Sequence, residues 1–191
     1  MSRAVRPAID IDIIVASARW KNPKKAQAVL RRAVTRAAAA TLSTSPAELA
    51  IVLSDDSAIR LLNRDWRGVD AATNVLSFPA TKSKRPGSGH LGDVILALET
   101  ITREARSEGK PFDHHLAHLG VHGFLHLIGY DHEHDSDAEE MEQAERDILH
   151  ALAIPDPYRD DPVERPKPRK TAKLKNPRGK RPARRAAKRK A

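Results

Sequence analysis

The sequence contains no cysteine, and only 4% of its residues are aromatic. The missing cysteines exclude disulfides and thiolate-ligated metals, so any transition metal would be held by nitrogen and oxygen ligands. We find no run of apolar residues long enough to span a membrane. Residues 1–16 also lack the apolar core of a signal peptide, and we therefore expect a cytoplasmic protein.

Acidic residues are absent from one end of the chain. Residues 165–191 hold 14 of the 34 Lys and Arg residues and no Asp or Glu, whereas the preceding residues carry 20 basic and 25 acidic side chains. We therefore expect a mildly acidic domain over residues 1–154 and a disordered basic tail over residues 155–191, which has too little apolar surface to offset its ordering entropy. We expect the tail to bind RNA phosphates with little sequence choice. A tail that only adds solubility is the alternative.

The periodicity of apolar residues predicts an α+β fold. Strict alternation in Ile9–Ile13 indicates a strand, and further strands are expected over 48–53, 74–78 and 94–98. Helices are expected over 22–42, 55–67, 99–107, 112–128 and 136–152, the last opened by a capping box of Ser136 and Glu139. This order predicts a small mixed β-sheet packed with helices.

The most specific pattern is formed by His122, His126 and His132. The first two are four residues apart, so they share one face of a helix. Gly129 can take a left-handed conformation that ends the helix, and the chain can then return His132 to the same point. Three imidazoles with one open position form a catalytic zinc site, whereas a structural zinc usually has a fourth protein ligand.

Residues next to these histidines bear on which reaction the site could catalyse. The same spacing occurs in metzincin proteases, which carry a glutamate directly after the first histidine as general base. Gly123 occupies that position, so peptide hydrolysis is not expected. Asp131 and Asp135 are the candidate fourth ligands of a structural site. We expect His118, one helical turn before His122, to lie beside the metal ligands or in the core.

Three blocks of the chain carry a resemblance to a known family. They read HLGVHGFLHLIGYDH over 118–132, LNRDWRGVDAATNVLSFP over 62–79 and LGDVILALET over 91–100. In content, order and separation they resemble the YbeY family of bacterial rRNA-maturation endoribonucleases. The resemblance implies a zincin-like, metal-dependent hydrolase domain with one Zn²⁺ per chain on His122, His126 and His132.

The resemblance also implies a function and its partners. It implies a single-strand-specific endoribonuclease that acts on rRNA precursors, notably at the 3′ end of the small-subunit rRNA, and in ribosome quality control. The expected partners are the rRNA precursor and the ribosomal small subunit. A non-catalytic ribosome assembly factor with a structural zinc is the alternative function.

Arg67, His118 and Asp131 are the candidate catalytic residues. Arg67 stands where the family carries a functional arginine, and it would bind the negative charge that develops on the phosphate. Judged by residue type alone, Arg67 would form a salt bridge at a helix end. His118, Asp131 or the 2′-hydroxyl pathway of the RNA would handle the proton. We expect Trp66 in the core rather than as a platform for a base.

Overall fold

Strands and helices follow one another in the predicted order along the part of the chain that the structure describes. This computed structural model describes residues 9–42, 47–80, 89–131 and 134–159. His132 and residues 160–191 of the predicted tail lie outside these ranges. The elements are β1 (Ile9–Val15), α1 (Pro23–Thr41), β2 (Ala47–Ser54), α2 (Asp56–Arg67), β3 (Val75–Pro79), β4 (His90–Ala97), α3 (Leu98–Ser107), α4 (Phe112–Leu127) and α5 (Asp135–His150).

The four described strands form one mixed sheet in the order β1-β2-β4-β3. β1, β2 and β4 are parallel, and β3 runs antiparallel to β4 at the edge. The register aligns Ile13 with Ile51 and Ile51 with Val94, so successive strands present apolar side chains on the same face. The α+β prediction is therefore confirmed.

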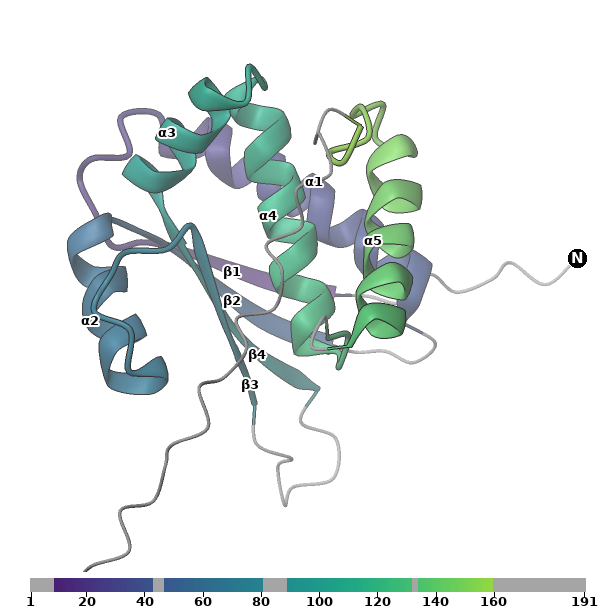
Figure 1. The fold of residues 1–191 in the computed structure, drawn as a ribbon, viewed down its shortest axis with the longest axis horizontal. Coiled ribbons are helices and arrows are strands. Elements are labelled where there is room, and N and C mark those ends of the chain that lie inside the picture. Colours follow the sequence, from purple (N-terminus) through teal and green to yellow (C-terminus); the bar gives the residue numbers. More distant parts are fainter. Residues whose placement is uncertain (1–8, 43–46, 81–88, 132–133, 160–191) are drawn as a thin grey trace, which may run out of the picture. The chain divides into compact units, whose positions relative to one another are not determined.

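The two faces of the sheet are covered unequally (Figure 1). α1, α4 and α5 pack over one face, where Ile51 and Leu96 meet the buried side chains of α4. α2 covers part of the other face, where Ile59 packs on Leu76 and Ile95. Because α4 lies between the sheet and its helical neighbours, it is apolar around most of its circumference, and Phe124 is fully buried.

The largest boundary difference from the predictions is at β4, and a predicted helix cap is also not formed. β4 begins at His90 instead of residue 94, because its first residues find hydrogen-bonding partners on β2. The prediction of a capping box at Ser136 is wrong. α5 begins at Asp135, and His134 is its N-cap. The Ser136 hydroxyl bonds to Asp137 and does not cap the helix.

The N-terminus of α2 is capped by Asp55. Its carboxylate accepts a hydrogen bond from Ala58 N at 3.0 Å. Hydrogen bonds from the Ser57 hydroxyl and the Ala58 amide lower the pKa of Asp55 to about 2. This cap orients the helix whose other end carries Arg67.

We expect Asp55→Ala to lower the free energy of unfolding by about 1 kcal/mol at neutral pH, while Asp55→Asn keeps most of the stability because Asn is an equivalent cap. The folded pKa lies below the usual value near 4 for an unfolded chain, so the charged cap stabilises the fold above that value. Its contribution is lost as the pH falls through about 2. Urea unfolding of the three proteins from neutral to acidic pH would measure this. A cost of Asp55→Ala that grows on acidification would contradict the assignment.

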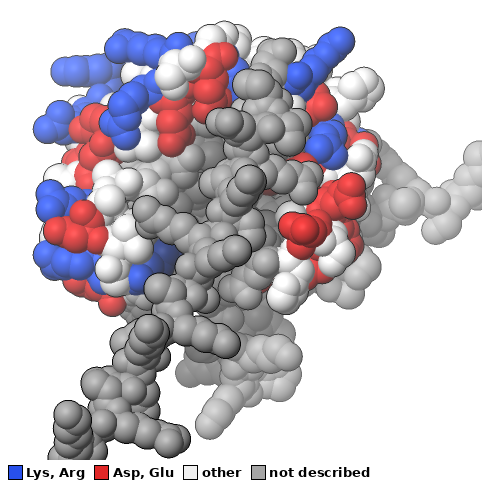
Figure 2. Space-filling model, viewed as in Figure 1, with Lys and Arg blue, Asp and Glu red and all other residues white. Residues whose placement is uncertain are grey.

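The described surface carries charges of both signs. On the face in Figure 2, acidic side chains lie over α5, and basic and acidic side chains interleave over α2 and α3. None of the helices in the described ranges has the length and apolar content needed to cross a membrane.

Candidate active site

A cleft of about 510 Å³ brings together side chains from three separate parts of the chain. They come from the end of α2, from β3 with the turn before it, and from α4 with the turn after it. The described lining residues are Arg67, Thr73, Asn74, Val75, Ser77, His122, His126 and Asp131. Four of the six predicted site residues therefore share one cleft, and His132 lies outside the described residues.

His122 and His126 project from α4 into this cleft one turn apart. Their Nε2 atoms approach to 3.2 Å, with the two rings nearly perpendicular at 84°. The His122 Nδ1 lies 2.8 Å from a Glu145 carboxylate oxygen, and the His126 Nδ1 lies 3.0 Å from the Tyr130 carbonyl oxygen. Both acceptors require a proton on Nδ1, so the neutral form of each ring carries its lone pair on Nε2, and the two lone pairs are directed toward the same point.

The turn after α4 supplies the backbone carbonyl that orients His126. Gly129 has φ +100°, as the prediction of a helix-ending glycine requires. The Tyr130 amide then bonds back to the Leu125 carbonyl at 3.1 Å, which closes the turn. This geometry brings the Tyr130 carbonyl oxygen within hydrogen-bonding distance of His126 Nδ1. It also places Asp131 in the lining of the cleft.

Glu145 on α5 is the buried anchor of the site. Its side chain is 0% exposed and accepts from His122 Nδ1 at 2.8 Å and from His118 Nε2 at 2.9 Å. The Tyr158 hydroxyl also donates to it. Burial raises the pKa of Glu145, but the hydrogen bonds and charges of the two imidazoles outweigh burial and hold the pKa at about 2.

His118 lies beside the cleft and is not among its lining residues. Its side chain is 15% exposed, and its Nε2 is engaged by Glu145. Its Nδ1 is buried without a hydrogen-bond partner among the described residues. This position matches the expectation that His118 lies beside the metal ligands, and it suits a side chain that positions Glu145 better than one that contacts substrate.

Arg67 reaches the cleft from the last residue of α2. Gly68 follows it with φ +70° and ends the helix, which turns the chain back toward β3. Among the described residues, no acidic side chain forms an ion pair with Arg67, in contrast to the helix-end salt bridge that its residue type favours. A guanidinium in this position can bind a phosphate bidentately.

The rest of the lining is held by hydrogen bonds. The Asn74 side chain donates to Glu104 on α3 at 2.9 Å and accepts from the Val75 amide at 2.7 Å. The Ser77 hydroxyl donates to the Gly123 carbonyl at 3.1 Å. A Cβ at Gly123 would lie 2.7 Å from a Val94 methyl, so close packing of α4 on the sheet leaves no room for a glutamate there.

Two residues that support the site, Glu145 and Tyr158, were not predicted from the sequence. Glu145 sits in a run of acidic residues on α5, so its charge did not separate it from exposed neighbours. The sequence did contain one signal. Glu145 follows Met141 by four residues and precedes Ile148 by three, so it lies on the same helix face as these two buried side chains. Tyr158 follows the predicted domain boundary at residue 154. Burial and the charge of Glu145 raise the pKa of Tyr158, and it therefore acts as a hydrogen-bond donor.

The donor set at the cleft is compatible with a divalent metal ion. Two imidazoles with converging Nε2 atoms, each held through Nδ1 by an oxygen acceptor, form the usual ligand and support arrangement of zinc proteins. Within the described ranges, no group of three or more His, Asp or Glu side chains is arranged to hold a metal. The predicted third ligand, His132, lies outside those ranges.

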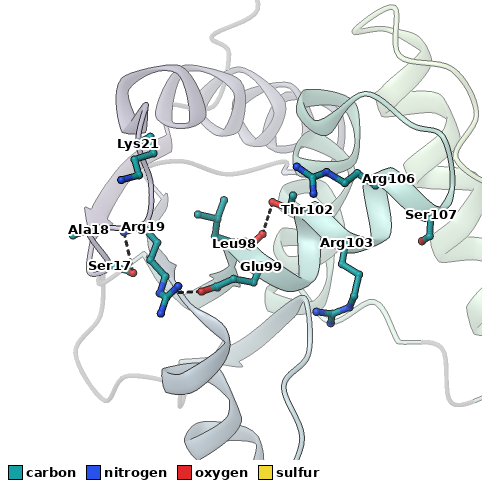
Figure 3. Close-up of a pocket in the computed structure, with 10 residues that line it drawn as sticks. All are labelled: Ser17, Ala18, Arg19, Lys21, Leu98, Glu99, Thr102, Arg103, Arg106 and Ser107. Atoms are coloured by element: carbon teal, nitrogen blue, oxygen red, sulfur yellow. Dashed lines mark hydrogen bonds and ion pairs between the residues drawn. The ribbon is translucent and has the colours of Figure 1, made fainter.

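A larger concavity of about 1150 Å³ lies between the loop after β1 and helix α3 (Figure 3). It contains none of the predicted site residues. Arg19 in its wall pairs with Glu99 at 3.0 Å, and Arg103 lies 3.5 Å from Asp56. We assign the chemistry to the smaller cleft because it contains the paired imidazoles and Arg67.

The chain is similar to one described protein family and to individual proteins that carry the same name. The family described as Endoribonuclease YbeY matches residues 14–153. A protein named Endoribonuclease YbeY from Rhodopseudomonas palustris (strain BisB18) is 51% identical over 84% of this chain and 97% of its own length. A protein of the same name from Nitrobacter winogradskyi is 53% identical over 83% of this chain and 85% of its own length.

A solution structure of a Thermotoga maritima protein matches with a TM-score of 0.42 and 21% identity, covering 82% of this chain and 98% of that one. The family match spans most of the chain and includes every candidate site residue described above except Tyr158. With relatives at about half identity, the conclusion is direct: the chain belongs to the YbeY endoribonuclease family.

Proposed function

We propose that this chain is a single-strand-specific, metal-dependent endoribonuclease. The observation that carries the proposal is the imidazole pair on α4, held through Nδ1 by Glu145 and Tyr130 O and converging at Nε2 inside the cleft. Membership in an endoribonuclease family supplies the reaction class. Arg67, which also lines the cleft, would supply a cation for the phosphate that is cut.

His122, His126 and His132 would hold one Zn²⁺ per chain, in a zincin-like domain over residues 1–154. When bound, such an ion polarises a phosphodiester oxygen and lowers the pKa of bound water toward neutrality. Glu145 and the Tyr130 carbonyl keep the Nε2 lone pairs of His122 and His126 directed into the cleft. His118 holds Glu145 in place from its other oxygen.

Arg67 and Asp131 have the positions to act on the substrate. Arg67 would bind the non-bridging oxygens and stabilise the charge that grows on them as the P–O bond breaks. Asp131 lines the cleft and would accept the proton of the attacking water. Gly123 cannot take that role, because it has no side chain and its α-carbon faces Val94.

The proposed substrate is a single-stranded rRNA precursor, at the 3′ end of the small-subunit rRNA, with a role in ribosome quality control. The small subunit is the proposed partner and the cytoplasm the proposed location. The test is cleavage of a single-stranded RNA with the precursor 3′ sequence, beside the same RNA in a duplex. We expect cleavage of the single strand and products with 5′-phosphates. Cyclic phosphates in all products would exclude attack by metal-activated water.

The basic tail is proposed to strengthen RNA binding without changing the chemistry. A truncation at the predicted boundary after residue 154 would remove Tyr158 and its hydrogen bond to Glu145. The truncation should therefore follow Arg159. We expect a smaller salt dependence of RNA affinity, by about 0.7 in logarithmic slope for each phosphate that the tail neutralises, and an unchanged cleavage rate for bound RNA. Identical salt dependence in the two proteins would assign the tail to solubility alone.

The alternative is a ribosome assembly factor in which the zinc is structural. A protein that binds metal and the small subunit but leaves single-stranded RNA intact would favour it. A fourth protein ligand on the bound metal, seen by X-ray absorption spectroscopy, would favour it as well.

A further inference from the structure

Trp66 is exposed, contrary to the prediction that it packs in the core. Its side chain is 72% exposed, the largest value among the exposed large apolar residues of the described chain. The buried residues of α2 are Ile59 and Asn63, and Trp66 is not among them. The last turn of α2 reaches the edge strand β3, where the Trp66 ring lies edge-on to Phe78 with the ring centroids 5.6 Å apart.

The surroundings of Trp66 are suited to a single nucleic acid strand. The next residue, Arg67, lines the histidine cleft and has no ion pair among the described residues. Arg64, also in the last turn of α2, is exposed and pairs only with its neighbour Asp65, at 3.0 Å. An open aromatic face flanked by arginines is the combination that single-strand-binding proteins use, with bases stacked on the ring and phosphates on the cations.

We propose that Trp66 stacks an unpaired nucleobase of the RNA, next to the phosphate that Arg67 binds in the cleft. The inference rests on the proposed function and adds a reason for single-strand specificity. A base can cover the ring only when it is free of a duplex, because a paired base has both faces stacked on its neighbours. Trp66 would thus select an unpaired nucleotide beside the bond to be cut.

A protein partner is the competing occupant of this ring. A stable protein interface buries on the order of 800 Å² on each side, and the other exposed apolar side chains near the end of α2 are Leu61 and Val69, each 50% exposed. Ion pairs interrupt this surface, with Arg60 bound to Asp70 at 2.7 Å. A small aromatic area flanked by arginines favours a base over a protein.

Intrinsic fluorescence can test the proposal, because the chain has two tryptophans in different environments. Trp20 is 5% exposed and donates its Nε1–H to the Ser54 carbonyl, so it serves as a constant background. The full-length, metal-loaded protein would be mixed with a short single-stranded RNA in a stopped-flow instrument, before cleavage proceeds. An abasic oligonucleotide of equal length retains the phosphates but offers nothing to stack. We expect quenching by the RNA and none by the abasic strand.

The variants give the affinity that stacking contributes. Trp66→Ala should weaken RNA binding by about 5- to 150-fold, the range measured for stacked bases, and leave abasic binding unchanged. Trp66→Phe should retain most of the affinity. Leu61→Ala, on the same helix and also exposed, is the matched control and should bind like the wild type. Thermal unfolding would check that each variant is folded.

Each result bears on a different claim. No RNA binding by the wild type would overturn the proposed function and this inference with it. Wild-type binding that is unquenched and unchanged in Trp66→Ala would overturn the stacking role alone. Equal losses on RNA and abasic strands would also overturn it, because the ring would then affect phosphate binding.

Discussion

His126→Ala is expected to abolish RNA cleavage and to lower metal affinity by more than 100-fold. The imidazole supplies one of the two converging Nε2 atoms, 3.2 Å apart, and alanine offers no donor in its place. Loss of one of the three proposed ligands should lower metal affinity more than loss of a residue that only supports a ligand, which lowers it roughly 10- to 100-fold. Metal content by mass spectrometry and cleavage of single-stranded RNA, measured on the same preparation, would give both quantities.

His150→Ala is the matched control for that variant. His150 is an exposed histidine at the end of α5, with no part in the cleft. We expect it to retain the metal and the activity of the wild type. If His126→Ala kept full metal and full turnover, the assignment of the metal centre would be wrong. If both variants and the wild type cut RNA equally without metal, the activity would belong to a contaminant.

Glu145→Ala is expected to destabilise the metal-free protein and to weaken metal binding. The carboxylate is 0% exposed and accepts from His118, His122 and Tyr158. Its removal leaves three partly buried donors without their acceptor, which should cost on the order of 3 kcal/mol of unfolding free energy. The His122 ring would also be without the hydrogen bond that sets its tautomer, with a roughly 10- to 100-fold decrease in metal affinity.

Urea unfolding without metal and a chelator competition with metal would separate the two effects of Glu145. Glu142→Gln is the control, because Glu142 lies one turn earlier on α5 in an exposed pair with Arg146 at 2.9 Å. Such a pair contributes less than about 1 kcal/mol. Equal stability of Glu145→Ala and Glu142→Gln would show that Glu145 does not anchor the site.

Three expectations from the sequence differ from the structure. Trp66 was expected in the core, but the sheet ends at β3 beneath the last turn of α2, and the ring is exposed. The pattern of Ser136 and Glu139 predicted a capping box, whereas His134 is the N-cap of α5. β4 begins at His90, earlier than predicted, because its first residues pair with β2. For Trp66 and for β4, the position of a neighbouring strand decided the outcome.

The amino-acid sequence by itself determined the order of strands and helices, and the helical spacing of His122 and His126 with the turn at Gly129. These features depend on residues a few positions apart, so the backbone geometry of a single helix or turn is enough to specify them. Packing between distant segments decided the rest. Only the tertiary structure brings Glu145 and Tyr158 to the imidazoles, buries that carboxylate and exposes Trp66, because burial is set by which elements meet and where they end.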